Sequence, residues 1–177
     1  MESSESKLTP NLLAFIALSN EFCAAMENAA TSTPADFART MLRLLPRIYI
    51  SASDIRPSGL SDNDFIEPAM DEDLYNAVCS SVAALMGEHD TYLEVFEEDM
   101  KFSDTPIAAS IAEGLTDIMQ VLYNFVETVR DAPVALIENA VDSVAEDFRN
   151  YWSRILCNQL RAINALVQSG VLEDEDY

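Results

Sequence analysis

The chain has 177 residues, of which 31 are acidic and 10 basic, so its formal net charge is −21 at pH 7. This charge argues against partners that require a basic face, namely nucleic acid and anionic membranes, and it favours a basic protein partner. Glycine (4) and proline (7) are scarce, no apolar run approaches the ~20 residues of a membrane span, and the length suits one domain.

The N-terminus and the cysteines indicate the compartment. Residues 1–7 are polar and carry no signal-peptide pattern, so we expect a disordered lead. Cys23, Cys79 and Cys157 lie far apart without Cys-x-x-Cys spacing, which predicts buried free thiols in a reducing environment. We therefore expect a cytoplasmic protein.

Thr-Pro pairs introduce the first two predicted helices. A threonine at the N-cap accepts a hydrogen bond from a backbone amide of the first turn. A proline at the first helical position costs no hydrogen bond, because the amide of that position has no partner within the helix. Thr9 therefore starts a helix over residues 10–29, and Thr33 starts another over residues 34–53. Pro46 lies inside the second helix and predicts a kink there.

The second helix carries the least random charge pattern in this acidic chain. Arg39, Arg43 and Arg47 are spaced by about one turn, so they share one face. They either form salt bridges with an acidic neighbouring helix or make an anion site, because guanidinium groups match phosphate and carboxylate. The pattern alone leaves both interpretations open.

One further helix is predicted between two irregular segments. Residues 54–70 show no period and are predicted as a loop, and a helix follows over residues 71–86 until Gly87 ends it. Residues 88–104 are predicted either to be irregular or to hold a short helix near 91–100. Within them, Thr91–Phe96 is the nearest thing to a strand, and no partner for it is evident.

The expected centre of the fold is one long helix over Thr105–Arg130, with Thr105 as its N-cap and Pro106 at its first position. Apolar residues cover most of its circumference, which is typical of a helix buried on several sides. Gly114 in its first half predicts that another helix crosses there at close range.

One strip of this central helix is polar and carries the first candidate site. Glu113, Asp117, Gln120 and Asn124 follow helical spacing and share a face. The strip is either the solvated edge of a partly buried helix or a polar groove. In such a groove Glu113 and Asp117 would hold a cation or raise each other's pKa.

Helical periodicity resumes over residues 134–168. A straight helix of this length would measure about 52 Å, which exceeds a compact domain of this size, so we expect a bend near Ser143–Asp147. Gly170 is predicted to end the last helix, so the bundle covers residues 8–170 and a loose acidic tail covers 171–177. The sequence thus predicts an all-α, single-domain bundle of about six helices around residues 105–130.

Catalytic groupings are absent from the sequence. There is no Gly-rich phosphate loop, no His-Glu-x-x-His and no paired Glu-x-x-His, and the single histidine, His89, has no neighbouring ligands. We assign no catalytic residue, no metal site and no cofactor, so the leading hypothesis is a non-enzymatic interaction or accessory protein. The alternative is a Mg²⁺-dependent hydrolase of a phosphorylated small molecule, in which Glu113 and Asp117 hold the metal and the three arginines meet the phosphate.

Several stretches resemble a known family. They are TPNLLAFIALSNEFC with MLRLLPRIYISASDI, the middle TYLEVFEEDMKFSDTPIAASIAEGLTDIMQVLYNFVE, and the late EDFRNYWSRILCNQLRAIN. Together they resemble an uncharacterised, all-helical bacterial domain family that is frequent in Bacteroidetes. The resemblance covers essentially the whole chain. It implies a helical protein of the bacterial cytoplasm and carries no known activity or ligand.

Overall fold

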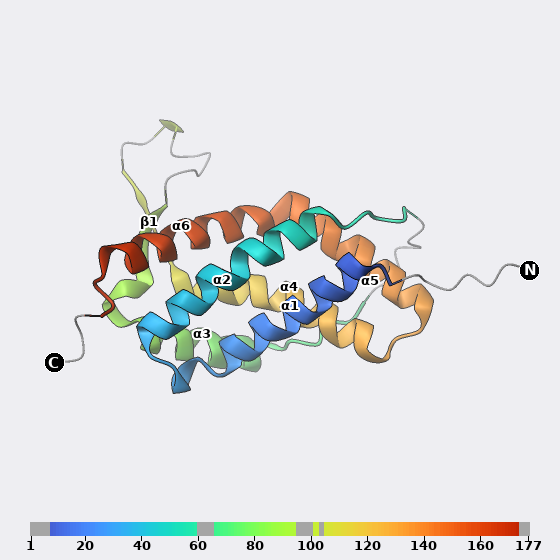
Figure 1. Cartoon of the computed structure of the whole chain (residues 1–177), viewed down its shortest axis with the longest axis horizontal. Coiled ribbons are helices and arrows are strands. Elements are labelled where there is room, and N and C mark those ends of the chain that lie inside the picture. The colour runs from blue at the N-terminus through green and yellow to red at the C-terminus, as the bar shows by residue number, and fades with distance from the viewer. Residues whose placement is uncertain (1–7, 60–65, 95–100, 103–104, 174–177) are drawn as a thin grey trace, which may run out of the picture.

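The computed structural model describes residues 8–59, 66–94, 101–102 and 105–173, which form a helical bundle with one short hairpin (Figure 1). Its α-helices are α1 (Pro10–Glu27), α2 (Pro34–Ser53), α3 (Glu72–Met86), α4 (Ile111–Asp131), α5 (Val134–Asp147) and α6 (Ser153–Ser169). Helix α4 contacts α1, α3, α5 and α6, and it lies behind α1 and α2 in Figure 1. The predicted all-α bundle around a central helix is confirmed. Among the described residues, no helix combines the length and apolarity needed to cross a membrane.

Local capping explains why three helices begin where the sequence predicts. Thr9 Oγ1 accepts a hydrogen bond from the Leu12 amide at 3.1 Å, and Thr33 caps α2 in the same way. Asp71 Oδ1 accepts from the Leu74 amide at 2.8 Å at the start of α3. Each cap depends on residues within one turn, so the signal is visible in the sequence.

The start of the predicted central helix was wrong. Residues 107–110 form strand β2 (Ile107–Ser110), which pairs antiparallel with β1 (Thr91–Glu94), and α4 begins only at Ile111. The short helix expected near 91–100 is therefore wrong over 91–94, and its remainder lies outside the described residues. The strand-like segment that lacked an evident partner finds it in residues assigned by the sequence to a helix.

Side-chain caps at Ser110 and Asp90 explain where α4 begins. Ser110 Oγ accepts a hydrogen bond from the Glu113 amide at 3.1 Å and donates to Asp90 Oδ2 at 2.7 Å. Asp90 Oδ1 accepts from the Ala112 amide at 2.8 Å. Asp90 ends the short 3-10 helix η2 (Gly87–Asp90), directly before β1, so the hairpin and the first turn of α4 are joined by the same side chains.

The bend expected near Ser143–Asp147 is a π-helical turn just beyond that range, at Phe148–Trp152. Trp152 is fully buried, and its ring centroid lies 4.7 Å from that of Phe148 and 6.4 Å from that of Phe15. Its indole Nε1 donates to the Val144 carbonyl oxygen at 3.3 Å. The helix thus takes up an irregular turn where two aromatic rings enter the core.

The described parts of the 54–70 loop are irregular, as predicted, and two side chains hold them. The Asp142 carboxylate on α5 accepts from the Ser58 amide at 2.7 Å, from Ser58 Oγ at 2.8 Å and from the Gly59 amide at 3.1 Å. Asn124 Oδ1 on α4 accepts from the Ala69 and Met70 amides, both at 2.8 Å. The loop is therefore fastened to the bundle on both sides of residues 60–65.

The three cysteines are free and lie on α1, α3 and α6, as predicted, but only Cys23 is buried. Burial, with the negative charges of Glu27 and Glu127, raises the pKa of the Cys23 thiol to about 12. Cys79 is partly exposed and Cys157 is exposed, so the expectation of burial was wrong for these two. The apolar stripe of α6 predicts its buried face, and Cys157 falls on the opposite side.

Candidate binding pocket

A pocket of about 160 Å³ lies between the β1–β2 hairpin, the first half of α4 and α6. We call it the hairpin pocket and define it by its polar lining residues, which are Tyr92, Glu94, Ser110, Glu113, Asp117, Arg154, Asn158 and Gln159. Strand pairing brings Tyr92 and Glu94 of β1 close to the start of α4, and α6 supplies further lining residues. Three segments far apart in sequence therefore meet in one polar site.

The described residues that line the hairpin pocket include three carboxylates and one guanidinium. Glu113 lies exposed on the first turn of α4, and Asp117 lies half-buried one turn further on. Asp117 Oδ1 accepts a hydrogen bond from the Tyr75 hydroxyl of α3 at 2.7 Å. Burial of Tyr75, together with this bond to Asp117, raises the pKa of the phenol. With Glu94 as the third carboxylate and Arg154 as the cation, the pocket is negative.

Gln159 is the most buried of the polar lining residues and is only 1 % exposed. Its Nε2 donates to the Ser110 carbonyl oxygen and to the Tyr92 hydroxyl, both at 3.3 Å. Because a carbonyl oxygen can only accept, the atom facing Ser110 has to be the amide nitrogen, which fixes the orientation of the amide. Gln159 Oε1 therefore faces away from the Ser110 carbonyl oxygen, and this buried oxygen has no hydrogen-bond partner among the described residues.

Glu94 is 9 % exposed and is also incompletely satisfied. Its Oε2 accepts a hydrogen bond from the Tyr92 hydroxyl at 3.3 Å, whereas its Oε1 is buried and has no partner in the part of the chain that the structure describes. Buried carboxylates are normally paired or fully hydrogen-bonded, because the loss of hydration is otherwise uncompensated. Glu94 and Gln159 thus each carry a buried acceptor oxygen that no described residue satisfies, and both residues line the same pocket.

The polar groove predicted along α4 is divided by the structure into two places. Glu113 and Asp117 line the hairpin pocket, whereas Gln120 and Asn124 line a separate cavity of about 360 Å³ beside α5. Asn124 already uses its side-chain oxygen to hold the 66–70 segment. The four residues therefore share a helix face without forming a single site.

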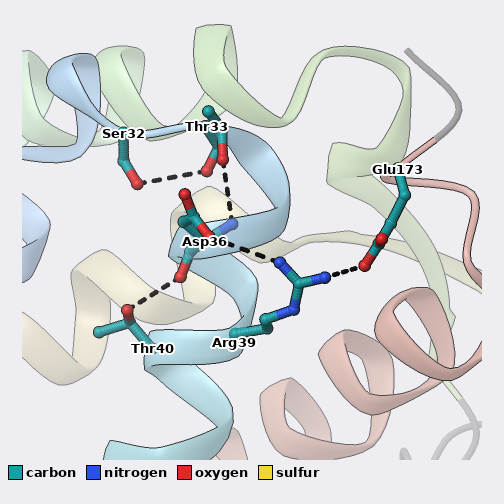
Figure 2. A network of polar contacts seen from close by, with 6 residues as sticks. All are labelled: Ser32, Thr33, Asp36, Arg39, Thr40 and Glu173. Atoms are coloured by element: carbon teal, nitrogen blue, oxygen red, sulfur yellow. Dashed lines mark hydrogen bonds and ion pairs between the residues drawn. The ribbon is translucent and has the colours of Figure 1, made fainter. Parts of the chain in front are cut away.

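The three arginines of α2 lie away from the hairpin pocket. Arg39 pairs with Asp36, at 3.4 Å, and with Glu173 (Figure 2), while Arg47 lies 4.0 Å from Glu21 of α1. Arg43 is exposed between them, and none of the described pocket-lining residues comes from α2. The geometry thus brings Glu113 and Asp117 together but leaves the three arginines outside the pocket, where Arg39 and Arg47 have acidic contacts of their own.

The contact with Glu173 also revises the expectation of a loose tail. Gly170 ends α6 in the left-handed conformation with φ 77°, as its position predicts. Leu172, two residues later, is 5 % exposed and belongs to the core. The described beginning of the C-terminal segment therefore packs on the bundle, anchored by an apolar side chain and by the Arg39 ion pair.

Comparison with known proteins places the chain in a family. A sequence profile described as domain of unknown function DUF5063 matches residues 6–169. The chain belongs to the DUF5063 family. The crystal structure of protein BF1032 from Bacteroides fragilis shares the fold, with a TM-score of 0.79 and 23% identity over 90% of this chain and 93% of that one. No curated protein matches the chain.

These findings confirm the resemblance to an uncharacterised, helical, Bacteroidetes-type family. Neither the family description nor the name of the B. fragilis protein assigns an activity. In this DUF5063 chain, the described residues contain no group of three or more His, Cys, Asp or Glu side chains arranged to hold a metal ion. The chemistry of the pocket has to be inferred from its own atoms.

Sequence reasoning found Glu113 and Asp117 but missed the most buried members of the pocket. Gln159 carries a signal that was available, because it falls on the apolar stripe of α6 between Leu156 and Ile163. A polar side chain at a core position of an amphipathic helix marks a buried polar contact. Glu94 carries no such signal, since its burial depends on a hairpin that the sequence pattern did not predict.

Proposed function

We propose that this chain is a non-enzymatic accessory protein of the cytoplasm that binds a basic protein segment at the hairpin pocket. The observation that carries the proposal is the convergence of Glu94, Glu113 and Asp117 on one pocket, whose described lining residues include Arg154 as their single cation. The net charge of −21 adds a long-range attraction for a basic partner, which raises the rate of encounter at low ionic strength.

The size of the pocket supports recognition of a side chain rather than of a metabolite. Pockets that enclose drug-sized ligands measure about 300–1,000 Å³, whereas the hairpin pocket measures about 160 Å³. One side chain of a partner fits such a volume, with the rest of the partner lying on the acidic surface around it.

The alternative hydrolase gains less support from the geometry. It needs cations beside Glu113 and Asp117 to neutralise a phosphate, but the pocket residues include Arg154 and none of the α2 arginines. The carboxylates themselves repel a phosphate, and Asp117 is engaged by the Tyr75 hydroxyl. We therefore favour a cationic ligand over a phosphorylated one.

Fluorescence anisotropy with labelled, end-capped peptides tests the proposal. A peptide rich in lysine and arginine is expected to bind, an acidic peptide of equal length is not, and the affinity of the basic peptide is expected to fall as salt is raised. Glu113→Gln at the pocket should weaken binding more than Glu146→Gln, which removes the same charge from an exposed position of α5. Equal binding of both peptides, or no binding of the basic one, would overturn the proposal.

A further inference from the structure

Two buried oxygens of residues that line the hairpin pocket find no hydrogen-bond donor among the described residues, and one hydroxyl connects the side chains that carry them. Gln159 Oε1 and Glu94 Oε1 are enclosed by protein and accept no hydrogen bond from the part of the chain that the structure describes. The Tyr92 hydroxyl accepts from Gln159 Nε2 and donates to Glu94 Oε2, each at 3.3 Å. Since native proteins rarely leave buried acceptors unsatisfied, the pocket is suited to a ligand that brings donors of its own.

We infer that Glu94 Oε1 and Gln159 Oε1 accept hydrogen bonds from one protonated primary amine, supplied by a lysine side chain or by a small diamine. This inference rests on the proposed function, because it uses the same pocket, and it adds the chemical group that enters it. An ammonium group carries three donors and a compact positive charge. It can therefore satisfy both oxygens, compensate the buried carboxylate and keep one N–H for water.

Other donors match these atoms less well. A guanidinium binds a carboxylate best through two parallel hydrogen bonds, and one oxygen of Glu94 is already taken by Tyr92. A divalent metal prefers several oxygen ligands including carboxylates, and the described part of the chain arranges no such group of acidic side chains. A water molecule supplies donors but leaves the charge of Glu94 uncompensated, beside Glu113 and Asp117.

Isothermal titration calorimetry with the full chain distinguishes the ligand groups. The probes are a capped peptide with one central lysine, the same peptide with acetyl-lysine, the same with arginine, and 1,5-diaminopentane. We expect the lysine peptide and the diamine to bind, the acetyl-lysine peptide to bind about tenfold more weakly or worse, and the arginine peptide to bind more weakly than the lysine peptide.

The variant Glu94→Gln is expected to change peptide affinity and Tm in opposite directions, which a merely structural role of Glu94 would not do. It keeps the size of the side chain and removes the charge, so it should weaken binding of the lysine peptide by about tenfold. It should also raise the Tm of the unliganded chain, because a buried charge without a full set of partners is removed. A Tm above that of the wild type shows that the variant folds, and Glu146→Gln is the control for which both readouts stay unchanged.

The outcomes separate this inference from the proposed function. Equal binding of the lysine and acetyl-lysine peptides overturns the inference, as does a Glu94→Gln variant that binds like the wild type, even where a polybasic peptide still binds the acidic surface. Binding of the diamine but of no peptide supports the inference and overturns the protein partner. A chain that binds none of the four probes holds water only, and the inference is then wrong.

Discussion

Two carboxylates buried to nearly the same extent lie in contrasting environments. Asp142 is 8 % exposed and accepts three hydrogen bonds from the 58–59 segment, while Glu94 is 9 % exposed and accepts one, at 3.3 Å. The surroundings of Asp142 are complete without a ligand, so its role is to hold a loop against α5. Among the described residues, Glu94 Oε1 finds no donor. The exposed fraction alone therefore does not distinguish a structural carboxylate from a ligand-binding one.

The same contrast extends to the residues around each carboxylate. Near α5, the indole of Trp152 donates to the Val144 carbonyl oxygen, and the described aromatic side chains there pack on one another. At the hairpin pocket, by contrast, Gln159 has a buried oxygen that no described residue satisfies. We expect the first region to carry stability and the second to carry binding.

The largest effect is expected from Trp152→Ala, which removes a fully buried aromatic side chain from the core near α5. Truncation of a fully buried tryptophan leaves a cavity and should lower the free energy of unfolding by about 3–5 kcal/mol. Urea denaturation followed by circular dichroism measures the loss. Trp152→Phe keeps most of the packing and should cost clearly less. An equally small loss for alanine would show that this region does not carry the stability of the bundle.

A matched pair of carboxylate-to-amide substitutions tests the comparison directly. Asp142→Asn turns one acceptor into a donor that faces either the Ser58 amide or the Gly59 amide, and should lower the free energy of unfolding by about 1–3 kcal/mol. Glu94→Gln makes the same chemical change at an oxygen that no described residue satisfies, and should raise the free energy of unfolding. Thermal melting of both variants compares them, and losses of similar size would remove the distinction between the two sites.

Gly114→Leu tests the close approach of α4 and α6 beneath the hairpin pocket. A Cβ at Gly114 would lie 2.6 Å from Gln159 Cδ and closer still to Nε2, which confirms the predicted helix crossing. Overpacking such a contact should lower the free energy of unfolding by about 1–3 kcal/mol. Ala165→Leu on the exposed side of α6 is the control and should be nearly neutral. An unchanged melting temperature for Gly114→Leu would mean that the two helices separate easily.

The smallest effect is expected at Asp147, which lines the cavity beside α5. Burial, with the nearby charge of Glu146, raises the pKa of this carboxyl above its ordinary value. The folded chain therefore holds the proton more tightly than the unfolded chain, and stability falls as the pH rises through the raised pKa. Asp147→Asn should be more stable than wild type at pH 7 by no more than about 0.5 kcal/mol, because the side chain is exposed and solvent screens its charge. Melting curves from pH 3 to pH 7 should show the difference vanish towards acid, and a constant difference would contradict the prediction.

Much of the fold was predictable, because its signals are local. The starts of α1, α2 and α3 follow from single capping residues, and the end of α6 follows from Gly170. The β1–β2 pairing was not predictable in the same way, since the small apolar residues Ile107 to Ala109 suit either a helix or a strand. Their conformation is decided by Thr91–Glu94, more than a dozen residues away in sequence.

The sequence by itself determined the helical class, the starts of α1, α2 and α3, the acidic character and the carboxylates Glu113 and Asp117. Only the tertiary structure decided that Glu94 and Gln159 are buried together, and that the α2 arginines are directed elsewhere. The physical reason is that hydrogen-bond caps and apolar periodicity act within a few residues, whereas the satisfaction of a buried polar atom depends on every segment that folds around it. An unsatisfied oxygen is a property of the packed chain and has no counterpart in the sequence pattern.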